Sequence, residues 1–356
     1  MRAFACPRCR SLVFFENSMC VTCGSALAFD RASAQIVSLV ASGTRLVHVD
    51  GSGREFGPCA NLASAGCNWL AATGAGEDLC GCCELTRTRP PDEDEEAVAA
   101  FARAEAAKRR LLFQLDGLGL PTTSRRVDPT RGLAFDLLSS RYQQVTTGHD
   151  GGVITIDLAE GDDAHREWVR ARLDEPYRTL LGHLRHEIGH WYWGLLVDAT
   201  PSLTRFRRLF GDETQDYGQA LSRHYGSAGD PDWTATYVSH YATAHPWEDW
   251  AETFAHYLHI RDALQTSVAW GVSVAGPDLD LSVAWDAQLV VDPVDEADEF
   301  DELIRAWLPL TYALNAENRA MGKDDLYPFV LAPAVIDKLR FVHAVVTGNA
   351  EPDPPG

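Results

Sequence analysis

The chain has 356 residues, enough for about two domains at the usual ~100–200 residues each. Its 31 Lys and Arg residues against 51 Asp and Glu residues give a formal net charge of −20, which argues against a broad nucleic-acid or anionic-membrane surface. No run of 18 apolar residues occurs, and the N-terminus MRAFACPRCR has no apolar signal core. We therefore expect a cytoplasmic protein with reduced thiols, in which clustered cysteines are metal ligands rather than disulfides.

The nine cysteines are confined to the first part of the chain. Cys6-x2-Cys9 and Cys20-x2-Cys23 form two knuckles separated by ten residues, the zinc-ribbon pattern in which four thiolates bind one Zn²⁺. So small a unit cannot build a sufficient core, and we expect metal binding to supply much of its folding free energy.

A second cysteine group follows, in which Cys80-x2-Cys83 repeats the knuckle spacing. We expect a second structural zinc site with the ligands Cys59, Cys67, Cys80 and Cys83. Cys82 is then left over, although it could replace Cys83 in a less usual knuckle. The sequence thus predicts one or two structural zinc ions in a zinc-ribbon module over residues 1–90.

The polar stretch TRTRPPDEDEE follows the last cysteine and indicates a domain boundary near residue 90, with a second domain over residues 91–356. From residue 95 to the glycines at 117 and 119, helix formers with apolar residues three and four apart predict a helix. Residues 153–157 alternate in polarity and predict a strand. That strand is either an ordinary core strand or a sheet edge along which an extended peptide can pair.

Helical patterns dominate the rest of the chain. They run from residue 165 to about 198, with Pro176 at the first turn of a new helix, and recur over 247–260, 300–320 and 333–346. A loop is expected around Gly276-Pro277, and the tail EPDPPG is expected to be frayed. The fold class predicted is α+β, a mainly helical domain with a small β-sheet, preceded by the small zinc-ribbon module.

The sharpest signal is the motif HEIGH, with His186, Glu187 and His190. Residues four apart share one face of a helix, so both imidazoles can reach one metal ion. Glu187 lies roughly 100° round the helix from His186, where it can reach a water on the metal without displacing a ligand. His183 is either a fourth ligand in a closed site or, as we expect, a structural histidine. The alternative for the whole motif is a helix that carries two histidines by chance.

A catalytic zinc site needs a third protein ligand and an open position. The segment WEDWAETFAHYLH offers Glu248 and Glu252, four apart in a mostly apolar helix where unpaired acids would be costly. We expect Glu248 to bind the metal and Glu252 to accept a hydrogen bond from the far nitrogen of a ligand histidine. Asp249 is the alternative ligand, and His240 and His245 in the preceding loop are weaker alternatives.

HEIGH followed about sixty residues later by E-x-x-x-E in an apolar helix resembles the gluzincin metallopeptidases. In some gluzincins a tyrosine upstream of the ligand glutamate donates to the transition-state oxyanion, and Tyr241 is in that neighbourhood; an ordinary core tyrosine is the alternative. Four segments extend the resemblance, over nearly the whole chain, to bacterial zinc-binding metallopeptidases with an N-terminal zinc ribbon: YRTLLGHLRHEIGHWYW, FGDETQDYGQAL, HYATAHPWEDWAETFAHYLHI and MGKDDLYPFV. The resemblance implies a zincin-like catalytic domain and one catalytic Zn²⁺.

The reaction expected is hydrolysis of a peptide bond by a zinc-activated water. Glu187 takes the proton of the water and passes it to the leaving amine, while Tyr241 and the metal hold the developing oxyanion. The partner expected is a peptide or protein substrate, with no nucleic acid and no membrane. The sequence does not indicate an oligomeric state.

Two other functions compete with a peptidase: a catalytically silent zincin-fold scaffold, and a zinc-ribbon regulator of nucleic-acid machinery. The intact Glu187 favours the enzyme over the scaffold, because a structural site needs no base. Up to residue 54 the ribbon module has six arginines and no lysine. This positive charge is too low for a groove that binds along a nucleic-acid phosphate backbone. A protein-docking, substrate-recruiting or purely structural role for the ribbon is therefore favoured.

Overall fold

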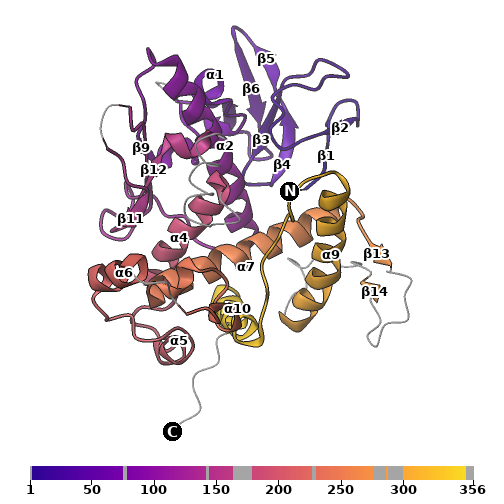
Figure 1. The fold of residues 1–356 in the computed structure, drawn as a ribbon. Coiled ribbons are helices and arrows are strands. Elements are labelled where there is room, and N and C mark those ends of the chain that lie inside the picture. Colours follow the sequence, from indigo (N-terminus) through magenta and orange to yellow (C-terminus); the bar gives the residue numbers. More distant parts are fainter. Residues whose placement is uncertain are drawn as a thin grey trace. The chain divides into compact units, whose positions relative to one another are not determined.

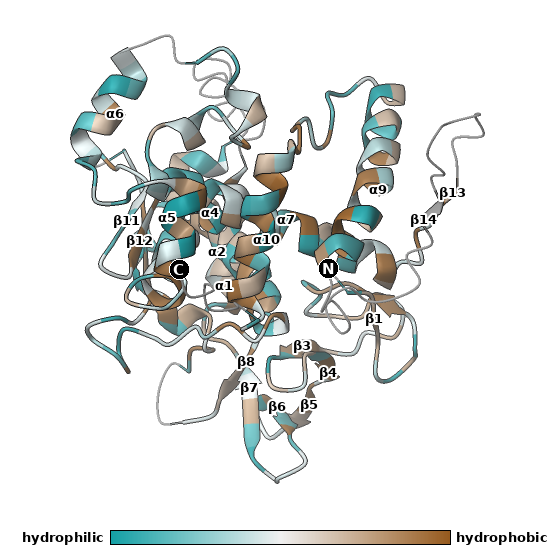
Figure 2. Ribbon diagram, turned by 90° about the horizontal axis from the view of Figure 1, so that it is seen from below, coloured by the Kyte–Doolittle hydropathy of each residue, from teal (hydrophilic) through white to brown (hydrophobic). Residues whose placement is uncertain are grey.

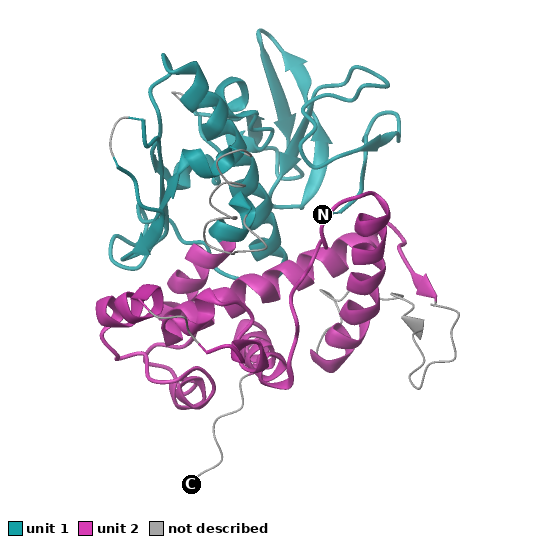
Figure 3. Cartoon of the chain, viewed as in Figure 1, with its two compact units in different colours: residues 1–166, 179–184 teal, residues 167–178, 185–356 magenta. Residues whose placement is uncertain are grey.

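The computed structural model describes residues 2–74, 78–141, 144–162, 179–226, 230–275, 286–287 and 300–349 (Figure 1). Two compact units divide the chain, residues 1–166 with 179–184 and residues 167–178 with 185–356 (Figure 3). In the described ranges, no helix is both long enough and apolar enough to cross a membrane.

The first unit begins with short antiparallel strands around the cysteine knuckles. One hairpin pairs β1 (Phe4–Ala5) with β2 (Leu12–Val13), and another pairs β3 (Leu27–Asp30) with β4 (Gln35–Ser38). An antiparallel sheet then follows in the order β5 (Val40–Ser42), β6 (Arg45–Val49), β7 (Glu55–Pro58) and β8 (Leu70–Ala72). The short helix α1 (Leu62–Ala65) lies between Cys59 and Cys67, and the 3-10 turn η1 (Cys83–Leu85) begins at the last cysteine of the second group.

Helix α2 (Glu95–Gly117) starts inside the acidic run and confirms the helix predicted from residue 95. Asp94 caps the helix, because its side chain accepts a hydrogen bond from the Ala97 amide at 3.0 Å. Glu95 and Glu96 in the first turn are favoured by the partial positive charge of the helix N-terminus. The acidic run therefore has a local structural role as a helix start.

A four-stranded sheet completes the first unit, in the order β11 (Gly148–Asp150), β12 (Val153–Asp157), β10 (Ala134–Leu138) and β9 (Thr86–Thr88), and the 3-10 turn η2 (Leu158–Gly161) follows it. The strand predicted over 153–157 is β12, which pairs in parallel with β10 and antiparallel with β11. Because both sides of β12 carry a partner strand, it is an internal strand. The alternative of a free edge for an extended peptide at β12 is wrong.

An aromatic core joins α2 to the ribbon strands. The Phe113 ring of α2 has its centroid 4.9 Å from that of Phe15 and 5.6 Å from that of Phe29. Trp69 is 5.2 Å from Phe29 and is buried with it. Residues on both sides of position 90 thus share one core. The division into residues 1–90 and 91–356 stays a prediction, and the contacts of α2 cross it.

Helices make up most of the second unit. Residues 185–196 of α4 (Leu180–Leu196) belong to it, followed by α5 (Leu203–Phe210), α6 (Tyr217–Gly226), α7 (Pro246–Ala269), α9 (Phe300–Ala320) and α10 (Pro333–Val346). Short elements connect them: η3 (Trp233–Ala235), η4 (Tyr241–Thr243), and β13 (Val274–Ala275) paired with β14 (Asp286–Ala287). Figure 2 shows polar and apolar residues interspersed along α9, as expected for a helix with one buried face.

These elements confirm the α+β class and the helices predicted over 247–260, 300–320 and 333–346, with α7 continuing to residue 269. The predicted helix around Pro176 lies outside the described residues, and so do the loop at Gly276-Pro277 and the tail EPDPPG. The HEIGH segment is helical as expected, within α4.

Gly189 allows α4 and α7 to lie close together. A Cβ at Gly189 would be 3.2 Å from Cα of Ala251 and 3.3 Å from Cβ of Phe254, which is tighter than ordinary van der Waals contact. The indole of Trp250 donates a hydrogen bond to the Gly189 carbonyl at 2.8 Å. Contact at the glycine of HEIGH therefore sets how the motif faces the first turns of α7.

Candidate metal centre

Three groups of side chains in the described part of the chain have the ligand types of a metal site. Within each group, one ligand atom per residue lies within 4.8 Å of the others. The groups are Cys6, Cys9, Cys20 and Cys23; Cys59, Cys67, Cys80 and Cys83; and His186, His190 and Glu248.

In the third group, α4 supplies two histidines and the first turn of α7 supplies the glutamate. The His186 Nε2 atom is 3.2 Å from His190 Nε2 and 3.0 Å from Glu248 Oε2, and the His190 Nε2 to Glu248 Oε2 distance is 3.5 Å. Ligand atoms placed ~2.0–2.2 Å from one tetrahedral zinc ion would be about 3.3–3.6 Å apart. The buried Oε2 atom accepts no hydrogen bond within the described ranges. This donor set therefore fits zinc.

Glu252 orients the first histidine of the group. Its Oε1 atom is 2.7 Å from His186 Nδ1, and its Oε2 atom accepts a hydrogen bond from the Ser239 hydroxyl at 2.6 Å. Burial alone would raise the pKa of Glu252, but the hydrogen bond from His186 lowers the pKa to about 2, so the carboxylate is charged. With its Nδ1 atom hydrogen-bonded to this carboxylate, His186 presents its Nε2 atom to the group, as in a metal-ligating histidine.

The start of α7 fixes the position of Glu248. The His245 side chain caps the helix by accepting a hydrogen bond from the Trp247 amide at 3.1 Å, and Pro246 occupies the first turn. His245, one of the weaker alternative ligands, is thus a helix cap. His240 packs against His224 instead, with ring centroids 4.7 Å apart. Neither histidine belongs to the metal group.

Asp249, the alternative third ligand, has a different partner. Its Oδ2 atom lies 2.6 Å from the Lys338 ammonium of α10 in a buried ion pair. The same ammonium donates to the Thr236 carbonyl at 2.9 Å. Asp249 therefore ties α7 to α10 and lies outside the metal group.

Histidine 183 likewise lies outside the group of three ligands. In the first unit, His183 Nδ1 is 3.4 Å from Glu160 Oε2. The structural role expected for His183 stays a prediction.

Glu187, the predicted base, is buried in the second unit. Burial raises the pKa of Glu187 above its ordinary value, and the charges of His186 and His190 oppose that rise. A carboxylate with a raised pKa is a better acceptor for a proton near neutral pH.

Two tyrosines lie beside the metal group. Tyr241 on η4 has its ring centroid 5.9 Å from that of His186. The Tyr217 hydroxyl donates to Glu248 Oε1 at 2.7 Å. Burial raises the pKa of both tyrosine hydroxyls, so both keep their protons at neutral pH.

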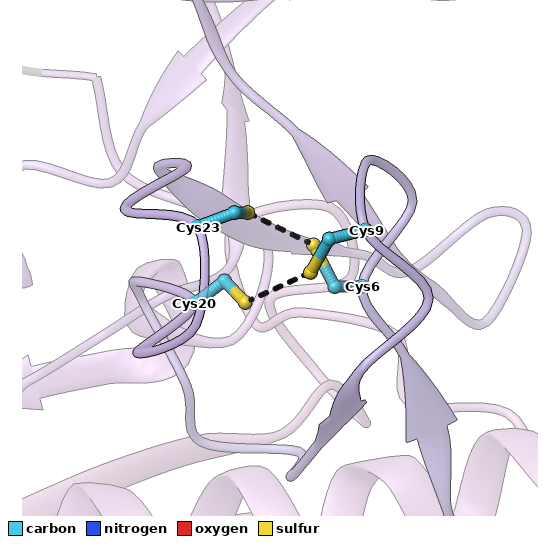
Figure 4. A group of neighbouring side chains, drawn as sticks. All are labelled: Cys6, Cys9, Cys20 and Cys23. Atoms are coloured by element: carbon cyan, nitrogen blue, oxygen red, sulfur yellow. Dashed lines mark hydrogen bonds between the residues drawn. The ribbon is translucent and has the colours of Figure 1, made fainter.

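The first cysteine group is built from two loops whose thiols point toward one another (Figure 4). The sulfur of Cys6 is 3.8 Å from that of Cys23, and the sulfur of Cys9 is 3.6 Å from that of Cys20. Thiolates ~2.3 Å from one tetrahedral zinc ion would be about 3.8 Å apart. A hydrogen bond with Ser11 lowers the pKa of the Cys9 thiol to about 6, which favours the thiolate that a metal requires.

The second cysteine group is buried at all four positions. The sulfur of Cys67 is 3.6 Å from that of Cys80, and the Cys83 amide donates to the Cys80 sulfur at 3.5 Å. Cys83 belongs to the group and Cys82 does not, which is the arrangement we expected. Burial raises the pKa of the Cys82 thiol, so Cys82 stays a neutral thiol.

Helix α2 places an ion pair beside the second group. The Lys108 ammonium is 2.6 Å from Glu105 Oε1, and both side chains are fully buried. The other carboxylate oxygen of Glu105 is 3.6 Å from the Cys83 sulfur. This pair connects α2 directly to a cysteine of the predicted metal site.

Arg109 of α2 is a second buried cation next to this group. One of its terminal nitrogens donates to the carbonyls of Ala65 and Gly66 at 3.1 and 3.4 Å, in the turn before Cys67. Its Nε and Nη1 atoms are buried and have no hydrogen-bond partner among the described residues. An uncompensated buried guanidinium is costly, and four thiolates around one Zn²⁺ would leave a net negative charge beside it. The surroundings therefore fit a metal-bound tetrathiolate.

Known families match both parts of the chain. A zinc-ribbon domain matches residues 3–94, which include both cysteine groups. The family described as "Putative zinc-binding metallo-peptidase" matches residues 97–345, more than half of the chain. The chain belongs to this zinc-binding metallo-peptidase family. The expected resemblance to zinc-binding metallopeptidases with an N-terminal zinc ribbon is thereby confirmed.

Relatives of the chain add no assigned activity. Uncharacterized proteins of Mycobacterium bovis and Mycobacterium tuberculosis are each 50% identical to the chain over 347 residues, which is 97% of this chain and 95% of the relative. No solved structure matches the chain.

The family motif segments contain one site residue to which we gave no role, Tyr217 within FGDETQDYGQAL. No spacing pattern in the sequence relates this tyrosine, at the start of a short helix, to Glu248, which is 31 residues later. Lys108 and Arg109 also carry no signal in the sequence, because within an Ala- and Arg-rich helix they resemble solvent-facing cations. Their burial was the missing information.

Proposed function

We propose that the protein is a zinc-dependent peptidase of the gluzincin kind, whose catalytic ion is held by His186, His190 and Glu248. The observation that carries the proposal is the convergence of these three ligand atoms within 4.8 Å. Glu187 follows the ligand His186 directly in the chain. Membership of a zinc-binding metallo-peptidase family supports a hydrolase.

Zinc supplies two effects when bound: it lowers the pKa of a water and polarises a carbonyl. Glu187 takes the proton of the attacking water and delivers it to the leaving amine, and its burial and raised pKa suit both steps. Tyr241 donates a hydrogen bond to the developing oxyanion, a role that its protonated hydroxyl allows. Glu252 keeps the tautomer of His186 fixed throughout.

The two cysteine groups hold structural zinc ions in this proposal, one each. Both cysteine groups lie in the first unit. Within that unit, Phe113 of α2 packs against Phe15 of the ribbon. The ions stabilise the unit rather than take part in hydrolysis, because four thiolates leave no open coordination position.

The partner proposed is a peptide or protein, in the cytoplasm. Apolar side chains are exposed on the ribbon, with Val21 at 88% and Phe14 at 53%, and such side chains suit contact with protein better than with phosphates. The net charge of −20 also opposes nucleic-acid binding. We propose that the ribbon meets protein.

Cleavage of a peptide library by the full-length protein, with and without chelator, tests the peptidase. We expect the wild type to cleave and Glu187→Gln to retain all its zinc but lose cleavage, because the amide cannot take a proton. Glu317→Gln on α9, an exposed position, is the matched control and should cleave as the wild type does. Cleavage that persists in Glu187→Gln would refute the mechanism.

A further inference from the structure

Tyr217 lies at the far side of the Glu248 carboxylate from the two histidines. Oε2 of Glu248 faces the histidine nitrogens, at 3.0 Å from His186 Nε2 and 3.5 Å from His190 Nε2. Oε1 accepts the Tyr217 hydroxyl at 2.7 Å. The two oxygens of one carboxylate therefore have separate partners.

The burial of Glu248 makes this hydrogen bond decisive. Glu248 is only 1% exposed, so loss of the Tyr217 donor leaves a buried carboxylate oxygen short of a hydrogen bond. A carboxylate whose second oxygen is free can swing to bind a metal through both oxygens, and this would fill the position that a catalytic site keeps open. The Tyr217 hydroxyl holds Oε1 away from the metal position.

Tyr217 is itself held against the start of α7. Its ring centroid is 5.3 Å from that of His245, the cap of α7, and 6.5 Å from that of Trp247. The Asp216 carboxylate accepts a hydrogen bond from the Gln219 amide at 2.8 Å and so fixes the first turn of α6. These ring contacts hold the Tyr217 side chain, which is 39% exposed, beside the first turn of α7.

We infer that Tyr217 is a positioning residue that keeps Glu248 a single-oxygen zinc ligand, an inference that rests on the proposed metal site. Removal of the Tyr217 hydroxyl frees Oε1, and the geometry of the ligand set changes without the loss of any ligand.

The test is Tyr217→Phe in the full-length protein, with zinc affinity measured by competition with a chelator. Loss of an outer hydrogen bond to a ligand costs about 10–100-fold in metal affinity, and we expect a loss of that order at this site alone. Tyr225→Phe is the matched control on the same helix, because this tyrosine is 66% exposed and should leave the affinity unchanged. Equal affinities in the two variants would overturn the inference.

A double-mutant cycle separates positioning from a general structural role. If Tyr217 acts through Glu248, Tyr217→Phe has little further effect on zinc affinity in a Glu248→Ala background. The same loss in both backgrounds would contradict that role. In cleavage assays of Tyr217→Phe, we expect a larger factor of change in kcat, which falls, than in KM. A wild type that cleaves no peptide would refute the proposed function and leave the zinc-affinity measurement valid.

Discussion

His186 Nδ1 lies 2.7 Å from Glu252 Oε1, and this hydrogen bond decides which nitrogen of the histidine faces the metal group. His186 lies four residues before His190 on α4, and Glu252 lies four residues after Glu248 on α7. The pair thus couples the orientation of a ligand to the contact between the two helices.

Replacing Glu252 with alanine removes the acceptor for His186 Nδ1 and frees the tautomer of the ring. We expect zinc affinity at this site to fall about 10–100-fold, measured by chelator competition. Ser239→Ala is the milder comparison, since it removes only the donor to the other oxygen of Glu252. If the two substitutions lower zinc affinity by the same factor, the orientation of His186 by Glu252 does not determine zinc binding.

Gly189→Ala should weaken both the fold and the metal site. The added Cβ would lie 3.2 Å from Cα of Ala251, so α4 and α7 must separate and the ligand atoms with them. We expect a lower Tm and a lower zinc affinity. Gly194→Ala is the control on the same helix, because a Cβ there meets nothing within 4 Å and should raise stability by about 0.5–1 kcal/mol. Similar Tm values for the two variants would contradict the close contact.

The sequence predicts much of the metal site, because residues four apart in a helix lie on one face. HEIGH places two imidazoles on one face, and E-x-x-x-E places two acids on one face of the partner helix. The sequence left Asp249 open as a ligand, and only the tertiary contact with Lys338, 89 residues later, separates it from Glu248.

Other features depend on contacts that no local pattern encodes. The alternation in residues 153–157 predicts a strand, but the neighbours of β12 come from sheet order, which places β10 and β11 on its two sides. In the same way, the apolar spacing of α2 predicts a helix without showing that Lys108 and Arg109 face the second cysteine group. Their charges become informative only with their burial.

Arg109→Met should weaken metal binding at the second cysteine group. The substitution removes a buried positive charge next to the thiolates and keeps most of the side-chain volume, so the anionic metal site loses compensation. We expect faster zinc release from this group under a thiol reagent, with release from the first group unchanged. Arg110→Met is the control, since Arg110 forms an exposed pair with Glu16 at 2.7 Å. Identical release curves would show that Arg109 does not compensate the site.

The two adjacent cysteines in the second group should behave differently. Cys83→Ser removes a ligand, whereas Cys82→Ala removes a buried neutral thiol outside the group. We therefore expect Cys83→Ser to lose one zinc ion per chain and Cys82→Ala to keep it. Zinc retention in Cys83→Ser together with loss in Cys82→Ala would reverse the assignment.

Zinc analysis of the purified full-length protein and of His190→Ala tests the central claim most directly. Filled cysteine groups and a filled histidine and glutamate site predict about three zinc ions per wild-type chain, and the substitution should remove one of them. The same zinc count in both proteins would contradict a metal site at His186, His190 and Glu248.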